Sequence, residues 1–258
     1  MTFPVFEGKH ALTAMVTPAE MIAHRRRGGR LPTFAAPVGA VICLERGLPE
    51  RMRRRVPLRR LGRLMGDLYS VRSTSGRIVV LTDFGLGAPI VAAQAEELIA
   101  LGARRLVSVA LSGGLQPDLA PGTVVISRTA LRDEGTSHHY LAPGPTVDAD
   151  ATLAESLSAS LSRDGVHVRA GTSWSTDAPY RETREEVAAY QAQGVLAVDM
   201  EVAALYAVAQ ARGVAAASAL VVGDSLAGGQ WRPPHRLDEM RRALDWAYCV
   251  AVEVADGR

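Results

Sequence analysis

Two acidic residues late in the chain are the strongest candidates for chemistry. Glu201 follows a short apolar run at 195–198, and Asp224 follows a second apolar run at 216–222. Each run has the length of a buried strand, and ligands of open α/β sheets bind outside the carboxyl ends of strands. Taken singly, Glu201 could be a first-turn helix acid and Asp224 a turn or N-cap residue. Their shared placement after strands favours a site in which carboxylates hold hydroxyls or transfer a proton.

Strands and helices alternate around these acids. Apolar positions from Met200 to Ala211 repeat at helical spacing, and Gly213 is placed to end that helix. The same patterns predict further helices at 18–27, 151–163, 182–193 and 237–254 and one ending at Leu101, with strands at 38–44, 77–81, 106–110 and 166–172. This alternation predicts a single three-layer α/β/α domain.

Composition narrows the classes of protein. The 258 residues are 48% hydrophobic with a mean hydropathy of +0.07, which is enough to build one large core. We expect no membrane span, because no window reaches about 18 apolar residues, and the first residues lack the order of a signal peptide. A net charge of +2 does not argue for nucleic acid. Cys43 and Cys249 are expected to be buried free thiols in a reducing, cytoplasmic compartment.

Arginines form three clusters, at 25–27, 53–55 and 59–60. The simplest interpretation places all three on solvated helix faces. The alternative is that one of these arginines serves an anion site, across a subunit interface.

Longer motifs link the acids to a known family. Residues 198–209 (VDMEVAALYAVA) and 221–226 (VVGDSL) resemble the signature of the purine/uridine nucleoside phosphorylase superfamily, which includes adenosylhomocysteine-type nucleosidases. The resemblance implies that Met200 and Glu201, with neighbouring Asp199, hold the ribose, and that Asp224 serves a purine base. Glu201 and Asp224 are then the expected catalytic residues.

The turn and helix at 84–106 also resemble this family, through its Gly-x-Gly-x-Pro turn. The likeness extends over roughly residues 38–255 and implies the phosphorylase fold, a central mixed sheet partly closed into a barrel. We therefore expect an N-terminal extension at 1–37 and a phosphorylase-like domain at 38–258.

A phosphate site is expected after the strand at 38–44. GLPER at 47–51 resembles the family's GDPxR turn, which implies that Gly47 and Arg51 contact phosphate. A glycine turn before a helix also gathers backbone N–H groups that can bind an anion. Leu48 replaces the family's Asp. Ser112 is the further candidate for phosphate.

The next strand departs from the phosphorylase pattern. Ser108 and Leu111 occupy the positions where phosphorylases usually carry an Arg and a Ser or Thr that bind phosphate. A dianion usually needs several charge-assisted bonds, which neither residue supplies. The nucleosidases of the family also lack this Arg, and they too have a glycine pair after the strand, as Gly113-Gly114 does here.

Three segments are expected near the base. Residues 174–182 resemble the family segment in which an aromatic ring covers the base, which implicates Tyr180 and Arg181 and leaves Trp174 to the core. Residues 131–140 resemble uridine phosphorylases more than purine ones, with His138-His139 expected as a hydrogen-bonded or exposed pair rather than a metal site. The glycine-containing loop at 227–236 is a candidate lid, from which Arg232 or Arg236 could help protonate Asp224.

These expectations converge on cleavage of an N-glycosidic bond. The favoured reaction is phosphorolysis of a nucleoside, with purine preferred, giving free base and ribose 1-phosphate; phosphate is the co-substrate and no other cofactor is expected. The alternatives are hydrolysis by water, a uridine-type phosphorylase, and a nucleoside-binding homologue without turnover. The resemblance also implies a homo-oligomer built from dimers, up to a hexamer. The base, the 5′ substituent and the oligomer size stay open.

Overall fold

The computed structural model describes residues 4–163 and 165–257. The strands are β1 (Gly39–Cys43), β2 (Leu58–Arg63), β3 (Asp67–Val71), β4 (Ile78–Thr82), β5 (Arg105–Gly114), β6 (Val124–Asp133), β7 (Thr146–Asp148), β8 (Val168–Thr176), β9 (Ala197–Asp199) and β10 (Ala215–Ser225). The α-helices are α1 (Pro18–Arg27), α2 (Leu48–Arg51), α3 (Ala88–Leu101), α4 (Ala151–Arg163), α5 (Arg184–Ala192), α6 (Val202–Arg212) and α7 (Leu237–Asp256). Short 3₁₀ turns include η3 (Ser137–His139) and η4 (Pro179–Arg181).

Half of the sheet closes on itself. β5 pairs with β10, β10 with β6, β6 with β8, β8 with β9, and β9 again with β5, so these five strands form a small mixed barrel. From β5 the sheet continues outward through β1, β4, β3 and β2. The expected mixed, partly barrel-like sheet is confirmed.

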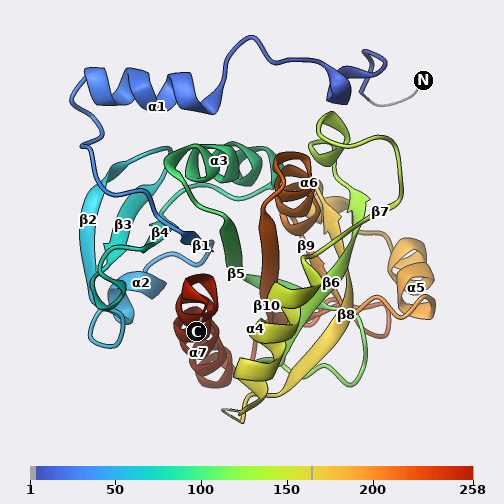
Figure 1. The fold of residues 1–258 in the computed structure, drawn as a ribbon. Coiled ribbons are helices and arrows are strands. Elements are labelled where there is room, and N and C mark those ends of the chain that lie inside the picture. The colour runs from blue at the N-terminus through green and yellow to red at the C-terminus, as the bar shows by residue number, and fades with distance from the viewer. Residues whose placement is uncertain (1–3, 164, 258) are drawn as a thin grey trace.

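Helices cover both faces of the sheet (Figure 1). α3 and α6 lie on one face, α4 and α7 on the other, and α1 lies outside α3. Each face has its own apolar core: in β1, Ala40 and Ile42 face the α3 side while Val41 and Cys43 face the α7 side. All residues of β1 are buried, as expected of a parallel strand covered on both faces. The predicted three-layer α/β/α arrangement is confirmed.

Local signals placed several helix ends correctly. α1 begins with a capping box between Thr17 and Glu20, with Pro18 at its first position. α6 ends at Gly213, whose φ of 64° lies in the left-handed region that glycine adopts without strain. α4 has the predicted bounds, and α7 runs two residues beyond Val254. Periodicity and caps were therefore sufficient for these helices.

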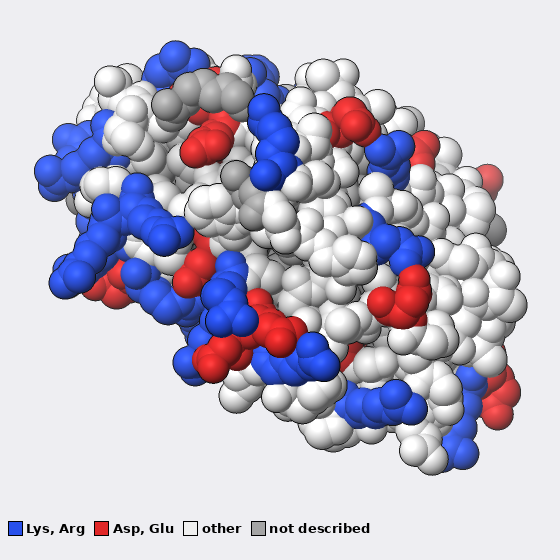
Figure 2. Space-filling model, turned by 90° about the horizontal axis from the view of Figure 1, so that it is seen from below, with Lys and Arg blue, Asp and Glu red and all other residues white. Residues whose placement is uncertain are grey.

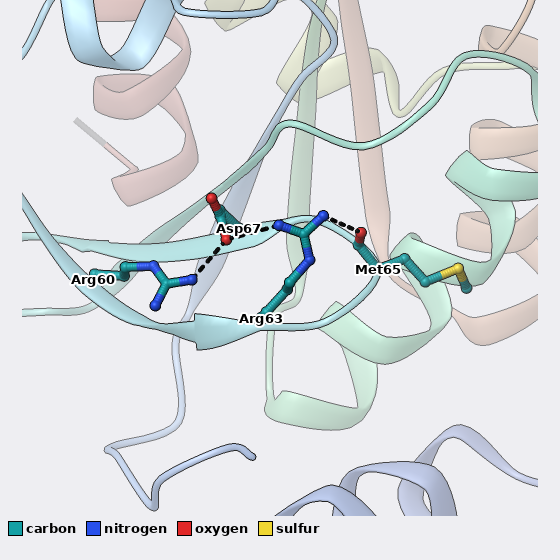
Figure 3. Close-up of polar contacts among 4 residues, drawn as sticks. All are labelled: Arg60, Arg63, Met65 and Asp67. Carbon is teal, nitrogen blue, oxygen red and sulfur yellow. Dashed lines mark hydrogen bonds and ion pairs between the residues drawn. The ribbon is translucent and has the colours of Figure 1, made fainter.

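The prediction for two of the three arginine clusters was wrong. Residues 53–55 form a turn after α2, and Arg59 and Arg60 lie in the edge strand β2; neither β2 nor β3 was predicted from the sequence. In this hairpin Arg60 Nη2 and Arg63 Nη1 donate to the same Asp67 Oδ1, at 2.9 and 3.2 Å, and Arg63 also reaches the Met65 carbonyl (Figure 3). Charged side chains are common on edge strands because they discourage pairing with other chains, so an arginine-rich strand resembles a polar helix face.

The segment before β1 packs on the rest of the molecule. Ile22 of α1 and Leu31 are buried in the core on the α3 side, and Arg25 forms an ion pair with Glu97 of α3. A boundary at residue 37 therefore stays a prediction. Cys43 is buried as expected, whereas Cys249 is only partly buried. No helix in the described ranges is both long and apolar enough to span a bilayer.

Candidate active site

Glu201 joins two of the motifs that the sequence singled out. It lies between β9 and α6, and only 7% of its surface is exposed. Its Oε1 accepts a hydrogen bond from the backbone N–H of Gly87 at 2.7 Å, and its Oε2 accepts one from the N–H of Met200 at 3.2 Å. The Gly-x-Gly-x-Pro turn before α3 and the Met-Glu pair before α6 thus meet at one carboxylate. We name Gly87, Asp199, Met200 and Glu201 the ribose end, after the role that the family resemblance implies for Met200 and Glu201.

Burial sets the protonation of this carboxylate. Desolvation raises the pKa of Glu201 to about 7, and the nearby charge of Asp199 adds to the rise, while the two N–H donors oppose it. Glu201 therefore changes charge near neutral pH, and a partner that donates hydrogen bonds to it favours the ionised form.

Asp199 is a buried support beneath Glu201. Its Oδ1 accepts from the Ser175 hydroxyl at 2.7 Å and from the N–H groups of Glu201 and Val202 at 2.8 and 2.9 Å. The last two bonds cap the start of α6. Burial raises the pKa of Asp199. Protein groups thus occupy Asp199 Oδ1. Its bonds to the N–H groups of Glu201 and Val202 fix the position at which α6 begins.

Asp224 approaches the ribose end through a glycine. In the sheet register Gly113 of β5 pairs with Asp224 of β10 on one side and with Val198 of β9 on the other. A methyl group at Gly113 would lie 3.3 Å from Asp224 Oδ1, 3.0 Å from Val198 Cγ1 and 2.8 Å from Leu226 Cδ1. Gly113 therefore permits the close approach that brings Asp224 near the strand leading to Met200 and Glu201.

The expected lid loop surrounds Asp224. Asp224, Arg232 and Arg236 line one cavity of about 300 Å³. Asp224 Oδ2 accepts a hydrogen bond of 2.6 Å from the indole Nε1 of Trp231, a residue that the sequence analysis passed over. We name Asp224 and the loop 226–236 the base end, after the role that the family resemblance implies for Asp224.

The aromatic segment lies at the rim of the base end. Tyr180 and Arg181 lie in η4, and the side chain of Tyr180 is completely exposed, so it covers nothing in the single chain. Glu182, which follows directly, lines a second cavity of about 420 Å³ together with Trp231. Burial, then the charges of Asp224 and Glu186, raise the pKa of Glu182 to about 7. No signal in the sequence marked Glu182, because its burial depends on the fold. Trp174 lies in the core as expected.

The GLPER turn, which the sequence predicted to bind phosphate, has an unexpected partner. Gly47 adopts φ 72° at the start of α2, and it lines a cavity of about 480 Å³ whose wall includes Arg53, Arg54 and Arg72. Arg51 is not among the lining residues: its Nε and Nη2 donate to Asp245 Oδ1 of α7 at 2.8 and 2.6 Å. Figure 2 shows positive side chains crowding the part of this face where α2 and the β2–β3 hairpin lie in Figure 1.

Ser108, Leu111 and Ser112 of β5, the three positions considered for phosphate binding, differ in burial and in hydrogen bonding. Ser108 is buried and donates to the hydroxyl of Ser218 at 2.6 Å, while Leu111 is 37% exposed. Ser112 is buried, and its Oγ has no hydrogen-bond partner within residues 4–163 and 165–257. An unpaired buried hydroxyl is uncommon, so Ser112 is the one of the three that offers a free polar group. We name Gly47, Arg51 and Ser112, the three residues expected from the sequence to bind phosphate, the acceptor end.

His138 has the hydrogen-bonded loop role that was expected. With its proton on Nε2, it donates to the Arg132 carbonyl at 3.2 Å, and its Nδ1 accepts from Arg132 Nη2 at 3.3 Å. Lys9 approaches His139 Nδ1 at 3.0 Å. In the described part of the chain, no three His, Cys, Asp or Glu side chains gather as a metal site would require.

Comparison with known proteins identifies the family. The model of the Phosphorylase superfamily matches residues 52–250, a range that begins just after the GLPER turn. Purine nucleoside phosphorylases of the DeoD type from Bacillus cereus (strain B4264) and Bacillus thuringiensis (strain Al Hakam) are each 34% identical over 170 residues, which cover 64% of this chain and 71% of each relative.

The fold agrees with a solved structure. Uridine phosphorylase from Vibrio fischeri ES114 matches with a TM-score of 0.74 and 22% identity, over 86% of this chain and 93% of that chain. The family match covers most of the sequence, including the segments that hold Glu201 and Asp224. The chain belongs to the Phosphorylase superfamily, whose matched members are purine nucleoside and uridine phosphorylases.

Proposed function

We propose that this protein cleaves the N-glycosidic bond of a purine nucleoside with phosphate, releasing the free base and ribose 1-phosphate. The observation that carries the proposal is the meeting of three strand ends: Glu201 after β9, Asp224 at the end of β10, and Gly113 of β5 between them. The transition state of such a cleavage has the character of an oxocarbenium ion, so the site must hold the sugar and neutralise the leaving base.

The ribose end performs the first task. Glu201 in its ionised form accepts hydrogen bonds from the 2′- and 3′-hydroxyls, while Met200 packs against the sugar. The N–H groups of Gly87 and Met200 hold the carboxylate in place before substrate arrives, so little reorganisation is needed during the reaction. Asp199 acts as a positioning residue through the N–H groups of Glu201 and Val202.

The base end performs the second task. Asp224 donates a proton to N7 of the purine, or holds the proton there, which turns the departing base into a neutral leaving group. Arg232 and Arg236, which share a cavity with Asp224, supply positive charge beside it. Tyr180 and Arg181, in the η4 turn at the rim of the base end, are assigned to contact with the base. The DeoD-type relatives are described as purine nucleoside phosphorylases, which agrees with a purine here.

Phosphate is assigned to the acceptor end. The N–H groups of the Gly47 turn and the free hydroxyl of Ser112 supply donors, and Arg51 supplies charge once it leaves Asp245. We propose a cytoplasmic homo-oligomer, in which a neighbouring copy adds further groups to this end.

Hydrolysis is the second candidate function. Ser108 is occupied by Ser218, and Leu111 presents an apolar side chain to solvent. If Arg51 stays bound to Asp245, and the arginines that line the Gly47 cavity do not contact the anion, no arginine binds a dianion and water becomes the acceptor.

Incubation with inosine, adenosine and uridine, each with and without phosphate, tests both candidates. Phosphate-dependent release of purine with ribose 1-phosphate supports the proposal. Free ribose at a rate independent of phosphate shows a nucleosidase instead. Cleavage of uridine alone contradicts the purine assignment. Binding of these nucleosides without turnover contradicts both reactions and leaves a nucleoside-binding homologue.

A further inference from the structure

The loop after β10 places an aromatic ring directly on Asp224. The indole Nε1 of Trp231 donates to Asp224 Oδ2 at 2.6 Å, a short bond in which the acceptor is a carboxylate. The rest of the ring is poorly covered, since 64% of Trp231 is exposed. A large apolar ring in this setting gains little from burial, so the hydrogen bond to Asp224 is the contact that distinguishes its position.

A tight hairpin fixes that position. Ser225 and Arg232 form an antiparallel bridge with N–H to O distances of 3.0 and 2.7 Å. The reversal between them uses Gly228 and Gly229, whose φ values of 79° and 72° are strained for other residues. Asp224 and Trp231 are the residues that precede the two members of the bridge, so the hairpin brings their side chains together. The base of the loop is attached to the barrel by a hydrogen bond from Leu226 N to Gly114 O.

The chemistry of the contact resembles that of the expected ligand. Indole and purine are both flat, fused rings of five and six members, and in each an N–H of the five-membered ring can donate to a carboxylate. The proposed function assigns Asp224 to N7 of the leaving purine, and N7–H is such a donor once the base is protonated. Trp231 therefore occupies the hydrogen-bond position that the departing base requires.

We propose that Trp231 is an internal competitor for the base subsite, which a purine must displace from Asp224 before the nucleoside can react. This inference rests on the proposed role of Asp224. It makes Trp231 a specificity-determining residue, because a uracil ring has no five-membered ring to offer Asp224 and leaves the Trp231 bond in place.

The ring has space into which it can move. Trp231, Gln230 and Gly229 line the cavity of about 420 Å³ on the η4–α5 side, together with Leu226 and Glu182. Rotation of the Trp231 side chain into this cavity leaves the Ser225–Arg232 bridge intact. The carboxyl group of Glu182 at the wall of the cavity is an alternative acceptor for the displaced indole N–H.

Tryptophan fluorescence of the full chain tests the displacement. The sequence holds three tryptophans, Trp174, Trp231 and Trp246. Titration with hypoxanthine or adenine, without phosphate, is expected to change the emission of wild type and of the Trp246→Phe control, and to leave Trp231→Phe unchanged. Trp246 is a suitable control because it lies on α7, where it contacts Arg55 rather than the base end.

Affinity gives the second measurement. Since Trp231→Phe removes the competing N–H but keeps an aromatic ring, calorimetry is expected to show a Kd for hypoxanthine about 3- to 10-fold lower than that of wild type. Weaker binding by Trp231→Phe would mean that the indole helps to hold the base, and that result overturns the proposal.

The activity of wild type separates this inference from the proposed function. The competitor role alone is overturned if wild type cleaves inosine, purine binding leaves the emission of Trp231 unchanged, and Trp231→Phe binds hypoxanthine with the Kd of wild type. If wild type and Trp231→Phe neither cleave nor bind any purine, both the competitor role and the proposed function are overturned.

Discussion

The ribose end and the acceptor end of the site are built in opposite ways. At the ribose end, Glu201 is buried and its two oxygens are held by the N–H groups of Gly87 and Met200. At the acceptor end, Arg51 is bound to Asp245 and the Ser112 hydroxyl has no partner in the described chain. The comparison shows that the carboxylate proposed to hold the sugar is preorganised in the single chain, whereas the groups proposed to bind the nucleophile are not.

The base end lies between these extremes. Asp224 pairs with Gly113 in the sheet, and the backbone of Gly87 holds the carboxylate of Glu201, but the partner of the Asp224 carboxylate is an exposed side chain on a loop. Rigid backbone donors cannot be replaced by a ligand, whereas a loop side chain can. We therefore expect the effects of substitution to decrease from the ribose end through the base end to the acceptor end.

The largest effect is expected at Glu201. Glu201→Ala removes the carboxylate proposed to accept the ribose hydroxyls, so kcat/KM for the nucleoside should fall by about 100-fold or more, with an unchanged circular dichroism spectrum. Glu185→Ala, an exposed acid at the start of α5, is the matched control and should keep wild-type kinetics. Wild-type activity of Glu201→Ala would remove the ribose end from the mechanism.

Substitution of Asp224 should discriminate between bases. Asp224→Asn keeps the size of the side chain but cannot protonate N7, so kcat/KM for inosine should fall by about 100-fold. Any activity on uridine should change only severalfold, because uridine has no N7. Asp238→Asn, an exposed acid at the start of α7, serves as the control. Equal losses on inosine and uridine would contradict the role assigned to Asp224.

The pH dependence of Glu201 provides a sharper test of preorganisation. Because the raised pKa is about 7, kcat/KM should fall about tenfold per pH unit below that value, as the carboxylate that accepts the hydroxyls is protonated. Glu201→Gln has no ionisable group at this position, so its kcat/KM, although much lower, should not show this fall below pH 7. A wild-type profile that is flat between pH 5 and 7 would contradict the assignment.

The same group links pH to stability in the free protein. An acid whose pKa is raised in the folded state stabilises the fold below its unfolded pKa of about 4.5, and this contribution is lost as pH rises through about 7. Between these limits the free energy of unfolding of wild type should therefore fall by about 3 kcal/mol relative to Glu201→Gln. Urea unfolding of both proteins at pH 4.5 and pH 8 measures this difference.

The parts of the fold that the sequence predicted depend on local signals. The capping box of Thr17 and Glu20, the Gly213 end of α6 and the apolar runs of the buried strands are all determined by neighbouring residues. The β2–β3 hairpin was missed because its edge strand carries arginines, whose burial pattern is set by the sheet and not by the segment. Local propensity could not separate this strand from a polar helix.

The candidate site likewise combines residues that local motifs marked with contacts that only the fold creates. Motifs pointed to Glu201, Asp224 and the Gly-x-Gly-x-Pro turn that contains Gly87. The contact of Arg51 with Asp245, however, joins residues 194 apart in the sequence and could not be predicted. The bond between Trp231 and Asp224 spans only seven residues, but it depends on the reversal at Gly228 and Gly229. Glu182 became a candidate only when the fold placed it in a cavity with Trp231.

Substitution of Gly113 tests whether Asp224 must approach strand β5 closely. Gly113→Ala places a methyl group 2.8 Å from Leu226 and 3.3 Å from Asp224 Oδ1, and such overpacking typically costs about 1–3 kcal/mol of stability. We expect a lower Tm and a loss of inosine cleavage. Gly144→Ala is the matched control, because Gly144 lies outside the three ends of the site and its methyl group would come no closer than 3.5 Å to a neighbouring atom, Arg132 Nη1. Full activity of Gly113→Ala would show that Asp224 needs no such close approach.

The smallest effect is expected at the acceptor end, and its direction is the informative part. Arg51 and Asp245 are both partly exposed, so their ion pair contributes less than about 1 kcal/mol to stability. If Arg51 must leave Asp245 to bind phosphate, Asp245→Asn releases it in advance, and the KM for phosphate should fall by up to about fivefold while kcat with saturating phosphate stays the same. Asp67→Asn, which frees Arg60 and Arg63 in the β2–β3 hairpin, is the control.

A higher KM for phosphate in Asp245→Asn would mean that Asp245 instead holds Arg51 in its binding position. An unchanged KM in both Asp245→Asn and Arg51→Ala would exclude Arg51 from the acceptor end and leave Gly47 and Ser112 as its only assigned residues.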